Sequence, residues 1–178
     1  MTLSSNKSYF SLFHVNHKSL DAHLDDLHAT LDLLGFPFQV IGVSETRENV
    51  LRGFKMNNTL HGYNLHSQPS SSAAGGVALY TSKSLNAVQR TDISVTDEEF
   101  ETVVCAYRHP SSSPERFTEH IETVLHNLVR ENKNIFILGD FNINLLNCVN
   151  HPASETFLNM TNSNYLLPYI LQPTPCNR

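Results

Sequence analysis

Polar side chains follow apolar, strand-like segments at four places in the sequence. Asn16 and Glu45 each follow such a segment, Tyr107 ends a third, and Asp140 and Asn142 come after a fourth. Strand ends are where a rigid sheet presents functional groups to a cleft, so we predict that these five side chains share one site. Each of them singly also suits a loop cap or a turn, because Asp and Asn bond to their own backbone.

Together the five side chains supply what metal-assisted hydrolysis of a phosphodiester requires. Mg²⁺ takes oxygen ligands from one or two carboxylates and keeps several waters, and Glu45 with Asn16 can supply those ligands. The amide of Asn142 and the phenol of Tyr107 suit phosphate oxygens. Asp140 can orient a water or hold a basic imidazole. The sequence therefore predicts a metal-assisted hydrolase of phosphodiesters.

The elements that would position these residues mix strands and helices. A helix is predicted from Leu20, because leucines recur at steps of three and four and Gly35 supplies a stop. A second helix is predicted from Ser113, a good N-cap followed by Pro114. Short apolar segments predict strands at 9–15, 38–43, 76–81, 102–107 and 134–138, and 67–74 reads as a mobile surface loop. The mixture predicts a layered α/β or α+β fold.

Composition excludes several classes of protein. The 178 residues favour one domain, and a net charge of -5 gives no global attraction to nucleic acid or to anionic lipid. Three widely spaced cysteines argue against a disulfide framework or a zinc knuckle. Neither a targeting segment nor an apolar stretch long enough to span a membrane is seen, so we expect a soluble, intracellular protein without a membrane partner.

Five short strings identify a resemblance to a known group. They are His14–Leu20, Ser44–Thr46, Gly75–Tyr80, Tyr107–Pro110 and Gly139–Leu146. Their order is similar to that in the endonuclease domains of non-LTR (LINE-like) retrotransposons, and the similarity extends over residues 8–174. Those domains belong to the endonuclease/exonuclease/phosphatase superfamily, together with DNase I and the apurinic/apyrimidinic endonucleases.

The resemblance implies a single domain over residues 1–178, built as a four-layer α-β-β-α sandwich of DNase I type. It implies that Glu45 is the principal ligand of Mg²⁺, or of Mn²⁺ in its place, and that Asn16 is its neighbour in the metal and phosphate shell. Tyr107 would contact the scissile phosphate, Asn142 would hold it, and Asp140 would work with a histidine to activate water. The substrate would be nuclear DNA, and the nick would prime a reverse transcriptase domain of the parent polyprotein.

Three departures from the family pattern change what we expect of this copy. A Ser-x-x-x-Asp-His motif, which carries the general base, is expected after Pro173-Thr174 and is absent, so the domain reads as C-terminally truncated. The two strands expected over 97–107 look fused, and Arg47 stands where the family has Trp. We therefore expect a slow or inactive nuclease. The alternatives are a non-catalytic remnant or binding module, and a phosphatase of small molecules or lipids.

Two further groups of residues carry no firm functional prediction. The ten histidines show no metal-binding spacing, and solvated helix or loop positions are expected for most of them. Arg108 is expected either to contact a DNA phosphate or to be an ordinary surface residue.

Overall fold

Two four-stranded sheets form the centre of the computed structural model, which describes residues 10–49, 58–71, 74–96, 100–102, 105–132, 134–146 and 148–170. The first sheet has the order β1-β2-β4-β3, with β1 at Leu12–Asn16, β2 at Val40–Ser44, β3 at Tyr63–Gln68 and β4 at Val77–Ser82. The second has the order β5-β6-β7-β8, with β5 at Val95–Thr96, β6 at Phe100–Thr102, β7 at Cys105–Arg108 and β8 at Leu138–Asp140. The pairs β1–β2 and β7–β8 are parallel, and the other pairs are antiparallel.

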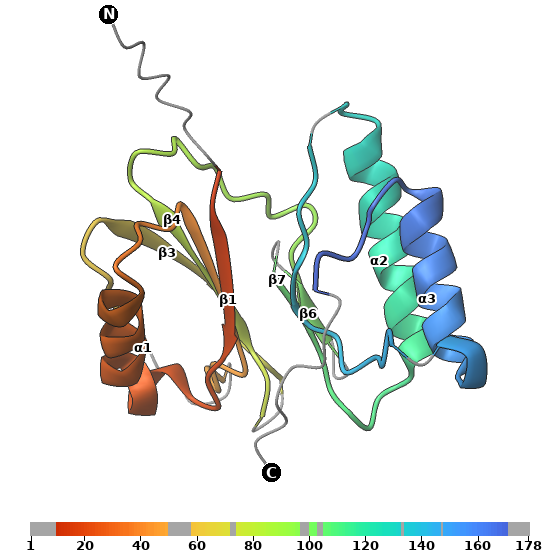
Figure 1. Ribbon diagram of the computed structural model, residues 1–178, viewed down its shortest axis with the longest axis horizontal. Helices are drawn as coiled ribbons and strands as arrows, with labels where there is room; N and C mark the ends of the chain where they lie inside the picture. Colours follow the sequence, from red (N-terminus) through yellow and green to blue (C-terminus); the bar gives the residue numbers. More distant parts are fainter. Residues whose placement is uncertain are drawn as a thin grey trace, which may run out of the picture.

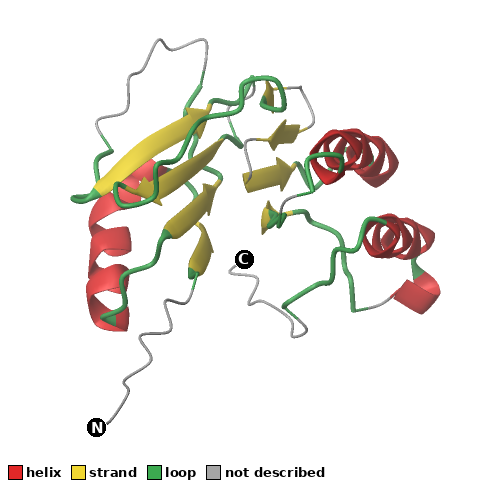
Figure 2. Cartoon of the chain, turned by 90° about the horizontal axis from the view of Figure 1, so that it is seen from above, coloured by secondary structure: helices red, strands yellow, loops and turns green. Residues whose placement is uncertain are grey.

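The helices lie on the outer faces of the two sheets, which face each other (Figures 1 and 2). Helix α1, Leu20–Leu34, covers the first sheet, while α2, Pro114–Val129, and α3, Pro152–Ser163, lie side by side over the second. A short 3-10 turn, Cys148–Asn150, precedes α3. The architecture is the predicted four-layer α-β-β-α sandwich. None of the helices in the described ranges is both long and apolar enough to cross a bilayer.

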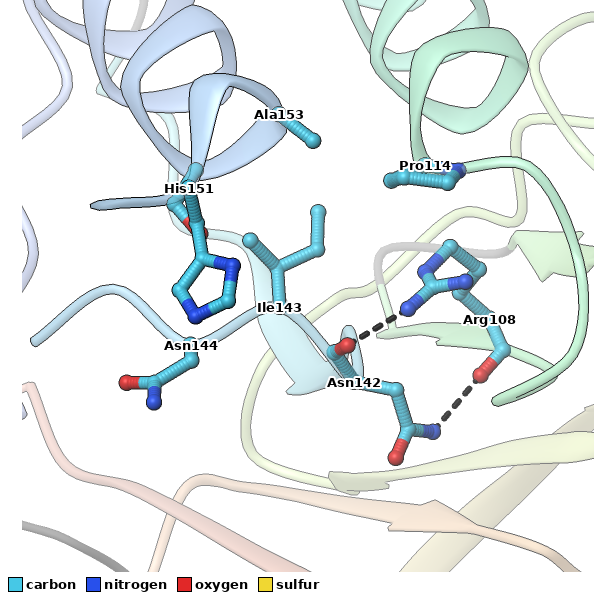
Figure 3. Close-up of a pocket in the computed structure, with 8 residues that line it drawn as sticks. Arg108, Pro114, Asn142, Ile143, Asn144, His151 and Ala153 are labelled. Atoms are coloured by element: carbon cyan, nitrogen blue, oxygen red, sulfur yellow. Dashed lines mark hydrogen bonds between the residues drawn. The ribbon is translucent and has the colours of Figure 1, made fainter. Parts of the chain in front are cut away.

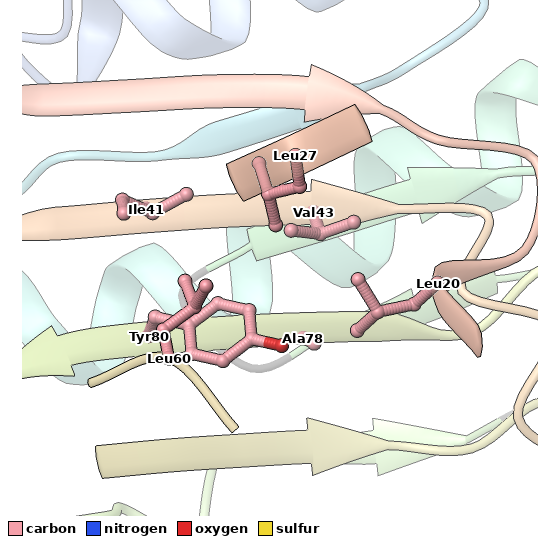
Figure 4. Close-up of a cluster of buried hydrophobic side chains, with 7 residues drawn as sticks. All are labelled: Leu20, Leu27, Ile41, Val43, Leu60, Ala78 and Tyr80. Carbon is pink, nitrogen blue, oxygen red and sulfur yellow. The ribbon is translucent and has the colours of Figure 1, made fainter. Parts of the chain in front are cut away.

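The outer core beside α1 follows from the spacing of its leucines. Leu20 and Leu27 are buried against Ile41, Val43 and other apolar side chains of the sheet (Figure 4). The predicted stop at Gly35 is confirmed, because this residue caps the helix with a φ of 56°. Leu34, which the same periodicity assigned to the apolar face, is 48% exposed at the end of the helix.

The second outer core is built by α2 and α3 together. Ser113 caps α2 as predicted, since its side chain accepts a hydrogen bond from the Arg116 N–H. Phe117 of α2 packs with Phe157 of α3 and with Phe141, which follows β8. Helix α3 was not predicted from the sequence.

A third core fills the space between the sheets and brings them close together. Val40 and Val77 of the first sheet pack with Cys105 and other buried side chains of the second. At Gly42 the sheets approach so closely that an added Cβ would lie 3.2 Å from both the Cys105 Sγ and the Leu138 Cδ1. This narrow layer ends at the strand termini that carry the predicted site.

Three local predictions were wrong. The two strands expected over 97–107 are not fused, and 102–107 is not a single strand, because β6 and β7 are separate strands that pair antiparallel; residues 103–104 between them lie outside the described residues. Residues 134–137 are not a strand; β8 begins only at Leu138. The predicted loop 67–74 begins inside β3 and contains a fully buried Ser70, which forms a bridge with Asn49.

Candidate active site

Asn16 connects the two predicted carboxylates. Its Nδ2 donates to the Glu45 Oε1 over 2.7 Å and to the Asp140 Oδ2 over 3.0 Å. Asn16 ends β1 and Asp140 ends β8, the edge strands of the two sheets, and Glu45 directly follows β2. Three side chains from distant parts of the sequence therefore meet at one end of the sandwich.

Backbone hydrogen bonds fix the segment that carries Glu45. Thr46 N–H and Arg47 N–H donate to the carbonyls of Gly76 and Gly75 over 3.1 and 2.8 Å. Glu45 itself has a φ of 55°, a left-handed conformation that is uncommon for residues other than glycine. Such backbone conformations persist where the surroundings over-determine them, and they cluster at functional sites.

Strand β8 and the turn after it position the second carboxylate. The Asn142 backbone N–H donates to the Asp140 Oδ1 over 3.1 Å, so the carboxylate caps its own turn. Asn142 has a φ of 49° and is exposed, while its Nδ2 donates to the Arg108 carbonyl over 2.7 Å. The amide thus lies at the rim of the site, where a ligand can reach it.

Arg108 is buried, so the expectation of an ordinary surface residue was wrong. It is only 4% exposed, and its guanidinium donates to the carbonyls of Phe141 and Asn142 after β8. It also donates to the carbonyls of His109 and Ser112 after β7. Burial lowers the pKa of Arg108, an effect opposed by the charge of Asp140. Arg108 therefore joins the two segments that present Tyr107 and Asn142, and its contact with DNA stays a prediction.

Tyr107 lies beside Asp140 across the β7–β8 pair, in register with it. Its ring is 2% exposed within the core between the sheets and contacts His109 edge-on, with the ring centroids 5.0 Å apart. The backbones of Tyr107 and Asp140 are therefore neighbours, while the Tyr107 side chain belongs to the core, and its contact with a phosphate stays a prediction.

His14 belongs to the same region, and sequence reasoning missed it. Its Nε2 lies 3.2 Å from the hydroxyl of the fully buried Ser44. Burial lowers the pKa of His14 to about 4, against the opposing charge of Asp140. Alternation along β1 was the available signal, because His14 lies two residues from Asn16 and so faces the same side of the sheet.

We expect His14 to make the stability of the fold depend on pH. Its folded-state pKa is below its unfolded value of 6.5, so the unfolded chain binds a proton first as the pH falls. The free energy of unfolding should be constant above about pH 6.5 and should fall by about 2 kcal/mol toward pH 4, after allowance for partial exposure. Urea denaturation of His14→Gln should show a weaker loss, whereas the exposed His61→Gln should behave as wild type. An unchanged loss in His14→Gln would contradict this assignment.

The donor set fits a hard divalent cation. The Glu45 and Asp140 oxygens lie 2.7 and 3.0 Å from the same nitrogen, and within the described ranges no Lys or Arg forms an ion pair with either carboxylate. Two neighbouring carboxylates repel each other, and a bound cation would offset that repulsion. No three His, Cys, Asp or Glu side chains of the described segments form a denser metal-binding group. Two carboxylates match Mg²⁺, which keeps several waters, while the Asn16 amide directs its N–H groups to both of them and its oxygen accepts from the Lys18 N–H over 3.4 Å.

Comparison with solved structures shows what the fold is similar to. The AP endonuclease LMAP from Leishmania major matches with a TM-score of 0.59 and 15% identity, over 86% of this chain and 65% of that one. The APE2 catalytic domain from Xenopus laevis matches with a TM-score of 0.54 and 18% identity, over 84% of this chain and 66% of that one. This chain thus spans a little less than two thirds of the length of either structure.

Comparison of the sequence gives the family. A search of curated proteins found no match. The sequence profile described as the Endonuclease/Exonuclease/phosphatase family matches residues 13–162, which include all five predicted site residues. The chain therefore belongs to the Endonuclease/Exonuclease/phosphatase family.

Proposed function

We propose that this chain is a Mg²⁺-dependent endonuclease that hydrolyses phosphodiester bonds in DNA, with Mn²⁺ able to replace Mg²⁺. The observation that carries the proposal is the shared hydrogen bonding of Glu45 and Asp140 to the Asn16 amide, 2.7 and 3.0 Å away. Family membership supports the class of reaction. The order of the sequence strings favours a LINE-like retroelement as the source.

The resemblance assigns a role to each of the five residues. Glu45 and Asn16 would hold the metal, which when bound offsets the charge that develops on phosphate oxygens. Asn142, exposed at the rim, would hold the phosphate with the part of its amide not donated to the Arg108 carbonyl. Tyr107 would contact the same phosphate from β7. Asp140 would accept the proton of an attacking water directly or orient a histidine that does so.

The biological setting that we propose follows from the resemblance. A nick by this site would free a 3′-hydroxyl, which a reverse transcriptase domain of the parent polyprotein would extend in the nucleus. For these 178 residues alone we propose a low rate of DNA nicking, because the general-base motif that the resemblance implies is absent from this sequence. General base catalysis is typically worth about 10²- to 10⁴-fold.

Nicking of supercoiled plasmid tests the proposal. We expect slow conversion to open circles with Mg²⁺ or Mn²⁺ and none with EDTA. Release of phosphate from small monoesters is measured in parallel, and monoester hydrolysis without nicking would indicate a phosphatase. If no nicking occurs although Mg²⁺ raises the melting temperature, the chain is a binding module, because a ligand of the folded state must stabilise it.

A further inference from the structure

Arg108 and Asn142 are joined by two reciprocal hydrogen bonds. The Arg108 Nη2 donates to the Asn142 carbonyl, and the Asn142 Nδ2 donates to the Arg108 carbonyl over 2.7 Å. Figure 3 shows both bonds beside a pocket of about 240 Å³ that the two residues line. Arg108 ends β7 and Asn142 follows β8, so the pair connects the ends of two neighbouring strands. The side chain proposed to hold the phosphate is therefore tied to a residue that the proposed reaction does not use.

The guanidinium of Arg108 donates only to backbone carbonyls within the described residues. Besides the Asn142 carbonyl, it reaches the carbonyl of Phe141 after β8 and those of His109 and Ser112 after β7. A guanidinium donates in one plane and in fixed directions, whereas the ammonium of lysine is a point charge on a flexible stem. Four carbonyls from two segments therefore require arginine at this position, and the side chain holds backbone instead of a ligand.

Arg108 supports the turn after β8, which carries Asp140 and Asn142. Asn142 has a φ of 49°, a conformation that is uncommon for residues other than glycine and persists where the surroundings over-determine it. Its backbone N–H donates to the Asp140 Oδ1 over 3.1 Å, while its carbonyl accepts from Arg108. The turn is thus held from both sides, by the carboxylate and by the guanidinium.

The reciprocal bond also decides which atoms of the Asn142 amide face a ligand. One Nδ2 proton is donated to the Arg108 carbonyl. The second N–H and the Oδ1 make no hydrogen bond to any residue that the structure describes, and the residue is exposed. A donor whose orientation is already fixed loses less freedom on binding than a rotating one, so it holds a phosphate oxygen better.

We propose that Arg108 is a positioning residue of the DNA-cleavage reaction: it fixes the turn after β8 and directs the second N–H of Asn142 to the scissile phosphate. The inference rests on the proposed function for the identity of the phosphate and for the role of Asn142. In this role Arg108 acts through Asn142 and needs no contact with DNA.

A double-mutant cycle on plasmid nicking tests whether Arg108 acts through Asn142. Asn142→Gly removes the amide and tolerates the positive φ, and it should lower the rate constant at saturating plasmid by about 10²-fold. Arg108→Lys keeps the charge but not the planar fork, and it should lower the same rate constant about tenfold with little change in KM. Because both substitutions remove the same contact, the double variant should be no slower than Asn142→Gly.

Two further variants complete the cycle. Arg130→Lys, exposed at the end of α2, is the matched control and should nick as wild type does. Arg108→Gln has planar amide donors but no buried charge, and it should repeat the pattern of Arg108→Lys if the lysine variant does not fold. All rates are measured well below the melting temperature of each variant. Losses that multiply in the double variant would show that Arg108 acts apart from Asn142 and would overturn the proposal.

The side-chain amide of Asn142 gives a readout that does not depend on cleavage. In ¹⁵N–¹H spectra its signal, identified by its loss in Asn142→Gly, should include one proton that is protected from exchange with water. Arg108→Lys should speed that exchange about tenfold, whereas the amide of Asn159, exposed on α3, should exchange equally in both proteins.

The two readouts separate this inference from the proposed function. Protection that Arg108→Lys removes, without plasmid nicking by wild type, would contradict the nuclease and keep Arg108 as the residue that fixes this amide. Nicking by wild type together with equal exchange of the Asn142 amide in wild type and Arg108→Lys would keep the nuclease and overturn the positioning role.

Discussion

Asp140→Asn is expected to reduce metal-dependent nicking of DNA by about 10²- to 10⁴-fold, the range that a positioned acid or base contributes. The substitution keeps the shape of the side chain and an acceptor for the Asn142 N–H, which now donates over 3.1 Å. It removes the charge that faces Glu45 across the Asn16 amide. The rate constant for plasmid nicking at saturating Mg²⁺ measures the effect.

The stability of the same variant distinguishes a chemical effect from unfolding. Removing one of two neighbouring carboxylates relieves repulsion but also removes a charge that favours the buried Arg108 guanidinium, so Asp140→Asn without metal should have a melting temperature close to that of wild type. Asp25→Asn, at an exposed position of α1, is the matched control and should retain full activity. Full activity in Asp140→Asn would show that Asp140 does not take part in the reaction. A loss of activity explained by a lower melting temperature would show the same.

Gly139→Ala should cause a large loss of stability. Gly139 lies in β8 with a φ of 149°, and an added Cβ would be 1.9 Å from the Ala106 carbonyl oxygen. Because that oxygen belongs to the backbone of the paired strand β7, the strands must separate. We expect a loss of about 3–5 kcal/mol in the free energy of unfolding, a large fraction of typical domain stability.

Gly62→Ala is the control for this prediction. Gly62 also has a positive φ, 85°, but nothing lies within 4 Å of an added Cβ. Its substitution should cost only the backbone strain, about 1–2 kcal/mol. Urea denaturation of both variants gives the comparison. Equal losses would show that the contact between Gly139 and Ala106 is not what requires glycine.

The parts of the fold that could be predicted from the sequence are those set by patterns within a few residues, such as leucine spacing and helix caps. The leucine spacing from Leu20 and the cap at Ser113 gave two helices at their observed starts, because periodicity and capping act within a few residues. The β6–β7 hairpin was missed because the valines at 103–104 carry no turn signal. Helix α3 lacks a strong cap, since His151 makes no capping bond, and its apolar side depends on contact with α2.

The candidate site shows the same difference between features set by local sequence patterns and features set by contacts between distant segments. The strand-end rule identified Glu45 and Asp140, and the structure places both against Asn16. The rule could not show that Arg108 is buried, because nothing in the local sequence indicates burial of a charged side chain. For the half-buried His14 the alternation along β1 was the only signal. Arg108 is held by four carbonyls from two segments, and those partners become neighbours only when the sheets pack.

Binding of Mn²⁺ followed by electron paramagnetic resonance tests the central claim most directly, that Glu45 and its neighbours hold a divalent cation. Wild type should bind one Mn²⁺ that excess Mg²⁺ displaces, and Glu45→Gln should weaken this binding by at least about tenfold, since a carboxylate ligand is lost. Glu119→Gln, at an exposed position of α2, should bind as wild type. Equal Mn²⁺ affinity in wild type and Glu45→Gln would contradict the account.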